Sequence, residues 1–69
     1  MNAEIKLRGI DHNIIISSIK TIKEYSNQTV KEYNNFADFF LTDANYTFIG
    51  NDIFHIRGND IEYVRFVQR

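Results

Sequence analysis

Residues 45–69 read NYTFIGNDIFHIRGNDIEYVRFVQR and contain the phrase Gly-Asn-Asp-Ile twice, eight residues apart. β-Branched and aromatic residues fill the segments before, between and after the two copies, which is typical of strands. Glycine at the first position of a two-residue loop favours a type II′ turn, because glycine accepts a positive φ angle without steric cost. We therefore predict three antiparallel strands joined by tight turns at Gly50-Asn51 and Gly58-Asn59.

The residue pairs that this register creates around the second turn support it. Arg57 faces Asp60, and His55 faces Glu62, so that a base meets an acid in each case. The remaining pairs oppose apolar to apolar residues or acidic to basic ones. Such cross-strand pairs contribute roughly 0.2–1 kcal/mol each. A turn at Asn-Asp would instead place apolar residues opposite charged or polar ones, so we prefer the first register.

Side chains alternate between the two faces of a sheet, so this meander has one apolar face and one mixed face. The apolar end of the mixed face consists of Phe48, Ile53, Val64 and Phe66, and its polar end of Tyr46, His55, Arg57 and Glu62. An antiparallel sheet normally leaves one face to water. We therefore predict that the apolar end is an interface covered by a second copy of the chain or by a target protein.

The N-terminal segment predicts one strand and then an ambiguous stretch. Residues 4–8 alternate charged and apolar side chains, as a half-buried strand does, and Gly9 ends the strand. Isoleucines then recur at helical spacing, which predicts a helix from about His12 to Tyr25. The β-branched run Ile14-Ile15-Ile16-Ser17 favours instead a second strand that forms a hairpin with the first. Both interpretations of this run stay open.

A second apolar stripe at helical spacing follows in the middle of the chain. Its members are Val30, Tyr33, Phe36, Ala37, Phe40 and Leu41. Thr29 and Glu32 fit a capping box, so we predict a second helix from about Val30 to Leu41, or a continuation of the first helix through a kink. The predicted fold is α+β, with an N-terminal strand on an undetermined sheet edge, one or two helices, and a three-stranded antiparallel meander whose one face the helices cover.

The composition indicates a single domain, residues 1–69, without covalent or metal support. A chain of this length buries a low fraction of its surface. It has no cysteine and only two histidines, so we expect neither disulfides, metal nor cofactor. Self-association or a partner is expected to supply the missing burial. No secretory segment or membrane-spanning stretch is recognisable, so we expect a cytoplasmic protein.

His55 beside Glu62, with Arg57 and Tyr46 nearby, is the titratable cluster that the predicted register creates. A carboxylate next to a histidine favours the imidazolium and would suit general acid–base chemistry. The cluster contains no serine or cysteine nucleophile, and the chain has no glycine-rich phosphate loop. We interpret it as a polar pair on a wetted part of the sheet, and we expect no enzymatic activity.

The predicted function is that of a small protein–protein interaction module, regulatory or inhibitory, that presents a sheet face and self-associates as a homodimer or binds a target protein. Proteins of this size are common among the regulators and inhibitors of bacteria, phages and mobile elements, which is an analogy only. The alternative is a single-stranded nucleic-acid-binding protein that stacks bases on Phe48 and Phe66. The net charge of −1 makes nucleic acid the less favoured ligand.

Overall fold

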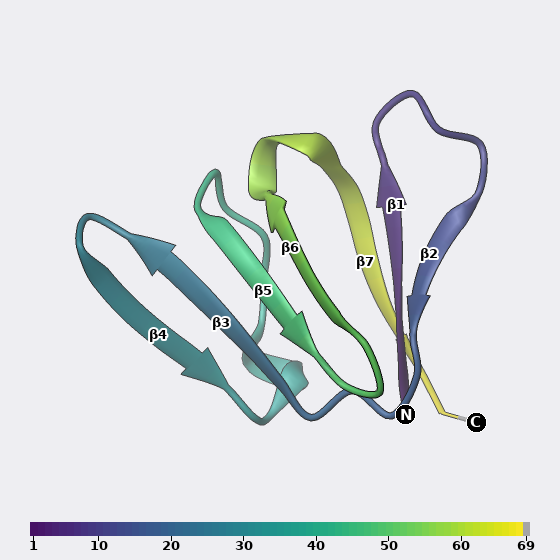
Figure 1. Ribbon diagram of the computed structural model, residues 1–69, viewed down its shortest axis with the longest axis horizontal. Coiled ribbons are helices and arrows are strands. Elements are labelled where there is room, and N and C mark those ends of the chain that lie inside the picture. The colour runs from purple at the N-terminus through teal and green to yellow at the C-terminus, as the bar shows by residue number, and fades with distance from the viewer. Residues whose placement is uncertain (69) are drawn as a thin grey trace.

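The computed structural model describes residues 1–68, and in that part of the chain it contains seven strands and two short 3₁₀ helices (Figure 1). The strands are β1 (Asn2–Leu7), β2 (Asn13–Ile16), β3 (Thr21–Ser26), β4 (Thr29–Tyr33), β5 (Asn45–Ile49), β6 (Ile53–Arg57) and β7 (Ile61–Val67). The 3₁₀ helices are η1 (Phe36–Asp38) and η2 (Gly58–Asp60). The fold is therefore all-β, and the predicted α+β class with its two helices is wrong.

The strands form two antiparallel sheets, ordered β2-β1-β7 and β4-β3-β5-β6. In Figure 1 the seven strands fan across the view, and β6 and β7 are neighbours that belong to different sheets. The chain changes sheet at the bend between β2 and β3 and again through η2. Bends of this kind are how strands turn the corners of two-sheet β folds.

The run of isoleucines forms a strand because its side chains alternate between the core and solvent. Ile14 and Ile16 of β2 pair with Ile5 and Ala3 of β1, and Ile16 is buried, whereas Ile15 between them is exposed. The alternative interpretation of this stretch, a hairpin with the first strand, is therefore what the structure contains. The helical spacing of the isoleucines joins residues of different elements.

The second predicted helix is replaced by a hairpin and a loop. Asn27 and Gln28 have φ angles of 50° and 66°, as the two central residues of a type I′ turn require, and they join β3 to β4. The hydroxyl of Thr29 donates to the carbonyl of Ser26 in this turn instead of capping a helix. An Asn-Gln turn lacks the glycine that usually marks such hairpins, so the sequence pattern concealed it.

The first hairpin of the predicted meander is present but has another turn and register, and the second hairpin is absent. β5 and β6 pair antiparallel, but Ile49 lies opposite Ile53, so the loop has three residues and the register differs by one from the prediction. Phe54 rather than Ile53 then lies opposite Phe48. β7 does not pair with β6, because it crosses to the other sheet and pairs with β1.

Both glycines of the repeated phrase are explained by close contact with other backbone segments. Among residues 1–68 the glycine with a positive φ is Gly9, so neither repeat glycine adopts the predicted type II′ conformation. A Cβ atom on Gly58 would lie 2.2 Å from the carbonyl oxygen of Thr42 and 2.7 Å from that of Ala44. A Cβ atom on Gly50 would lie 2.6 Å from the carbonyl oxygen of Ser17. Each glycine therefore lies where two backbone segments come too close to leave room for a side chain.

The core lies between the two sheets and is closed by the segment 34–44, which we call the aromatic loop. The largest fully buried side chains of the core are Tyr46, Phe48, Ile5, Ile22 and Ile61. Phe39 of the aromatic loop contacts four rings, with centroid distances of 5.2 Å to Tyr33, 5.5 Å to Tyr46, 5.9 Å to Phe66 and 6.3 Å to Phe48. All four contacts are edge-to-face, the arrangement that aromatic pairs favour. The aromatic loop therefore joins side chains of both sheets.

Substituting Gly58→Ala is expected to lower the free energy of unfolding by at least about 2 kcal/mol, because a methyl group cannot fit against two backbone carbonyls. The neighbouring exposed residue provides the control, since Asn59→Ala is expected to change stability by less than about 0.5 kcal/mol. Urea unfolding followed by circular dichroism measures both. Equal stability of the two variants would contradict the close contact.

Phe39→Ala is expected to cost roughly 3 kcal/mol of stability, since it removes the ring that contacts both sheets. The adjacent Phe40 is 68% exposed, so Phe40→Ala removes the same number of atoms and is expected to cost less than about 1 kcal/mol. Thermal unfolding of the two variants separates them. A larger loss for Phe40→Ala would show that the aromatic loop packs with the other ring inward.

Candidate interaction surface

The four apolar residues predicted to form an interface do not share one surface. Phe48 is fully buried in the core, and Val64 is half-buried against it. Phe66 stacks on Phe36 with ring centroids 4.8 Å apart. Ile53 lies on the opposite side of its sheet and is exposed. The aromatic loop of the same chain thus supplies the cover that we expected from a partner.

The four predicted polar residues also separate. Tyr46 points into the core, and its hydroxyl accepts from the backbone N–H of Thr42 at 2.7 Å. Glu62 lies on β7 of the three-stranded sheet, 3.1 Å from the ammonium of Lys6 on the neighbouring strand β1. The predicted contact between His55 and Glu62 is therefore not formed, because β6 and β7 do not pair.

His55 and Arg57 remain together on β6, with partners from their own side of the molecule. The Nδ1 atom of His55 lies 2.8 Å from the hydroxyl of Thr47, its direct neighbour on β5. The Nε atom of Arg57 donates to a carboxylate oxygen of Asp60 at 3.2 Å. The predicted pairing of Arg57 with Asp60 is confirmed as a contact, although it spans η2 and does not join two strands.

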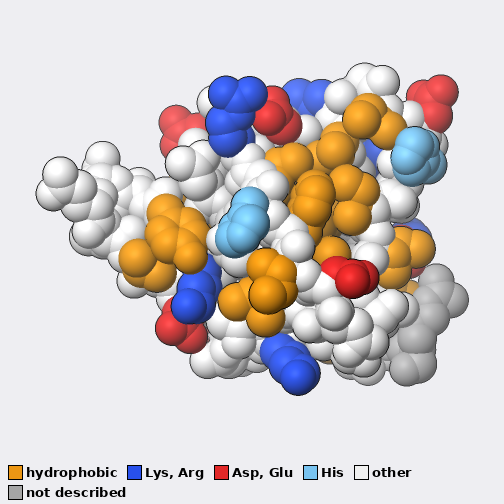
Figure 2. All heavy atoms as spheres, in the orientation of Figure 1, with side chains coloured by type: hydrophobic (Ala, Val, Ile, Leu, Met, Phe, Trp, Pro, Cys, Tyr) orange, Lys and Arg blue, Asp and Glu red, His pale blue; other side chains and the backbone are white. Residues whose placement is uncertain are grey.

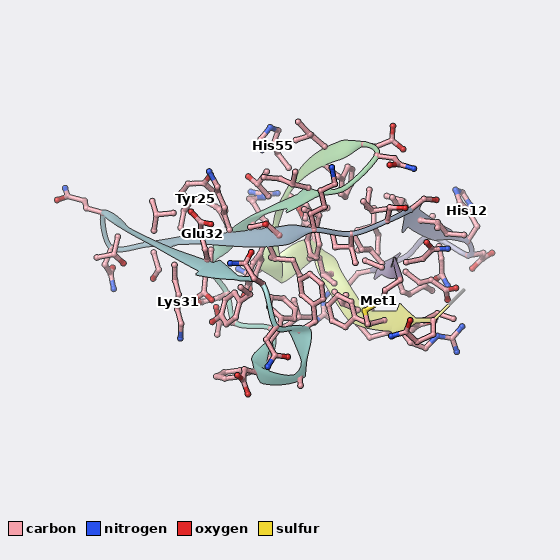
Figure 3. The ribbon with its side chains drawn as sticks, turned by 90° about the horizontal axis from the view of Figure 1, so that it is seen from below. Met1, His12, Tyr25, Lys31, Glu32 and His55 are labelled. Atoms are coloured by element: carbon pink, nitrogen blue, oxygen red, sulfur yellow. The ribbon has the colours of Figure 1, made fainter. Side chains whose placement is uncertain are left out.

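These residues belong to the side of the four-stranded sheet that points away from the core, which we call the outer face. The register between strands assigns to it Thr21, Lys23, Tyr25, Val30, Glu32, Asn45, Thr47, Ile49, Ile53, His55 and Arg57. Figure 3 shows Tyr25 and His55 on one side of this sheet and Lys31 on the other. The outer face therefore gathers side chains from all four strands.

A shallow groove follows β5 across the outer face. Its floor contains the short side chains of Asn45 and Thr47, whereas longer side chains of Tyr25 on β3 and of His55 and Arg57 on β6 stand on either side. The open hollow has a volume of about 670 Å³. It combines an aromatic ring with hydrogen-bonding groups, which suits the side chains of a protein partner.

Large apolar side chains flank this groove. Tyr25 and Val30 are direct cross-strand neighbours and are 38% and 58% exposed, and Ile53 at the other end is 64% exposed. Figure 2 shows hydrophobic side chains in several separate groups, with lysine, arginine and histidine between them. Tyr25 and Val30 were predicted to lie in helices, and the turn between them, Asn27-Gln28, lacks the glycine that would have marked a hairpin.

The hydroxyl–imidazole contact of Thr47 and His55 is the nearest approach to a nucleophile beside a base. Thr47 is only 4% exposed and lies beneath the imidazole, so a substrate carbonyl would not reach its oxygen. His12 lies far from His55 in Figure 3. In the described part of the chain, no three side chains of the metal-ligating types gather. The arrangement is chemically suited to hydrogen bonding with a bound partner.

On the side of the β3–β4 hairpin that faces the core, the hydroxyl of Tyr33 donates to a carboxylate oxygen of Glu24 at 2.8 Å. Burial of Tyr33 raises the pKa of its phenol above the ordinary value, and the carboxylate of Glu24 raises this pKa further. Lys31 lies over the ring of Tyr33 at 5.0 Å and opposes this effect. This hydrogen bond joins the two strands of the hairpin, and the ring of Tyr33 packs against Phe39 of the aromatic loop.

Comparison of the chain with protein-family models, with curated proteins and with solved structures found no match. Within residues 1–68 no helix has the length and apolar character needed to cross a bilayer. The groove, the exposed apolar side chains and the strand edges are therefore the features from which a function is inferred.

Spectrophotometric titration at alkaline pH is expected to show Tyr33 ionising above pH 10.0, the ordinary value for tyrosine. The difference between wild type and Tyr33→Phe isolates this phenol from the other tyrosines. Because the folded state holds the proton more tightly, the contribution of Tyr33 to stability is complete below pH 10 and is lost as the pH rises through the folded-state pKa. A midpoint at or below 10 would contradict the burial of this hydroxyl.

Proposed function

We propose that the protein is a small, non-enzymatic protein–protein interaction module, regulatory or inhibitory, that acts in the cytoplasm through the outer face of its four-stranded sheet. One observation carries this proposal: Tyr25, Val30 and Ile53 are large, apolar and exposed on a single face. The solvated face of an antiparallel sheet is normally polar. Side chains of this kind lose unfavourable contact with water when a partner covers them.

The chemistry of the outer face also suits a protein partner. Tyrosine and arginine are the residue types most enriched at the energetic centres of protein interfaces, and Tyr25 and Arg57 stand on the two sides of the β5 groove. The side chain of Asn45 lies between them, and His55 stands beside Arg57 on β6, so both add hydrogen-bonding groups. A partner side chain in this groove would meet both an apolar wall and polar groups that fix its orientation.

Two other uses of the sheet are less well supported. Phe48 is fully buried and one face of Phe66 is stacked on Phe36, so the two rings do not form a shared platform for nucleic-acid bases. The cations of the outer face are accompanied by acids, since Lys23 pairs across strands with Glu32 and Arg57 contacts Asp60. The predicted homodimer through the side of the sheet that carries Phe48 also loses its physical reason, because the aromatic loop of the same chain already covers that side.

The proposal is tested by capture on immobilised wild-type protein, identification of the retained protein, and measurement of its affinity with both components purified. Tyr25→Thr combined with Ile53→Thr keeps strand-forming residues and removes apolar contact area, so it is expected to weaken binding at least about tenfold.

Ile15→Thr is the matched control, since Ile15 is exposed on the other sheet, and it is expected to bind as wild type does. Circular dichroism verifies that all variants are folded. Equal affinity of the double variant and the control, or no partner for the wild type, would refute the use of the outer face.

A further inference from the structure

The strand β4 directs a row of backbone hydrogen-bonding groups away from its sheet. In an antiparallel pair, alternate residues point their N–H and C=O groups toward the same neighbour. Ser26 and Thr29 flank a two-residue turn and pair with each other, so they exchange hydrogen bonds. Two residues farther along, Lys31 does the same with Glu24. The N–H and C=O groups of Val30 and Glu32 therefore point outward from the edge.

No segment within residues 1–68 pairs with this edge. β4 is the last strand of its sheet, and its first four residues are all exposed. Figure 1 shows the hairpin of β3 and β4 projecting from the body of the molecule at the end opposite β2. An uncovered edge of this kind can be extended by a further strand.

The charges on β4 argue against extension by a second copy of the chain. Because Val30 and Glu32 carry the outward groups, a two-fold antiparallel contact has few possible registers. Pairing Val30 with Glu32 of the copy brings the two Lys31 side chains directly opposite each other, and pairing Glu32 with Glu32 opposes two carboxylates. Pairing Val30 with Val30 places Glu32 opposite Gln28, whose φ of 66° lies outside the strand. Like charges directly opposite on neighbouring strands are destabilising.

We propose that the edge of β4 binds an extended segment of a partner protein as a fifth, antiparallel strand of the sheet. The segment carries a basic residue opposite Glu32, an acidic residue opposite Lys31 and an apolar residue opposite Val30. This inference deepens the proposed function and rests on it, because the added strand would continue the same outer face. It is strand addition to a sheet edge, with backbone bonds giving affinity and alternate side chains giving selectivity.

Each position of the added strand has a physical reason. The apolar side chain continues the row of Val30 and Tyr25, both exposed, and shields them from water. The acidic side chain lies on the inner side of the sheet beside Lys31, whose other strand neighbour is Glu24. The basic side chain continues the row of Lys23 and Glu32 and restores alternation of charge there.

The test uses two synthetic pentapeptides of identical composition, with blocked ends, added to isotopically labelled protein. The peptide Thr-Arg-Glu-Val-Thr matches β4 in the antiparallel direction, whereas Thr-Glu-Arg-Val-Thr opposes like charges at two positions. Shifts of backbone amide resonances report binding. We expect the matched peptide to shift the amides of Val30 and Glu32 and to bind at least about fivefold more tightly than the exchanged one.

Two variants separate backbone pairing from side-chain effects. Val30→Pro removes an N–H group that the hairpin itself does not use, and it is expected to abolish peptide binding, whereas Val30→Thr keeps the N–H group and retains binding. The double variant Lys31→Glu with Glu32→Lys is expected to prefer the exchanged peptide. Circular dichroism and thermal unfolding verify that each variant is folded.

Equal binding of both peptides, unchanged binding by Val30→Pro, or no amide shifts at millimolar peptide would overturn the inference. Sedimentation of the wild type tests whether a second copy of the chain occupies the edge instead. A wild-type dimer that the Val30→Pro substitution dissociates would assign the edge of β4 to a second copy and overturn the inference. The two proposals fail separately. If the edge tests fail while Tyr25→Thr with Ile53→Thr still releases a captured protein, the outer face is the interaction surface without strand addition.

Discussion

Close contact between backbone segments is the constraint on which both passages between the sheets depend. At Gly58 the chain turns from β6 into η2 against the carbonyls of Thr42 and Ala44, and at Gly50 the β5–β6 loop lies against the bend that leads from β2 to β3. The contact at Gly58 also includes a hydrogen bond, because the N–H of Gly58 donates to the carbonyl of Ala44. A side chain at either position would push these backbone segments apart.

The aromatic loop determines which surfaces remain for function. Small domains bury a low fraction of their chain, and here one loop closes the open side of the core through Phe36, Phe39 and Leu41. Because this cover comes from the chain itself, the inner side of the four-stranded sheet has no need of a partner. Exposed apolar side chains are left on the outer face, and unpaired backbone groups are left along β4.

The sequence predicted the features that depend on neighbouring residues and failed on those that depend on distant ones. The strands around residues 4–8, 46–49 and 61–67 were recognisable from alternation and β-branched content. The strand 61–67 pairs with β1 and not with β6, the strand before it. This choice depends on the contact of Gly58 with distant backbone, which a local sequence pattern does not reveal. For the site, His55 and Arg57 were rightly placed on one face of a strand, whereas Tyr25 and Val30 were hidden because apolar spacing of three and four residues fits a helix equally well.

The pairing of β1 with β7 has a consequence for how the molecule is made. It joins segments at far ends of the described sequence, and the guanidinium of Arg65 reaches the carboxylate of Glu4 over a sequence separation of 61. During synthesis the first strand is made before its partner β7 exists, so Ile5 cannot yet pair with Val64. Contacts of such long sequence separation slow folding. The three-stranded sheet can therefore be completed only after β7 has been translated.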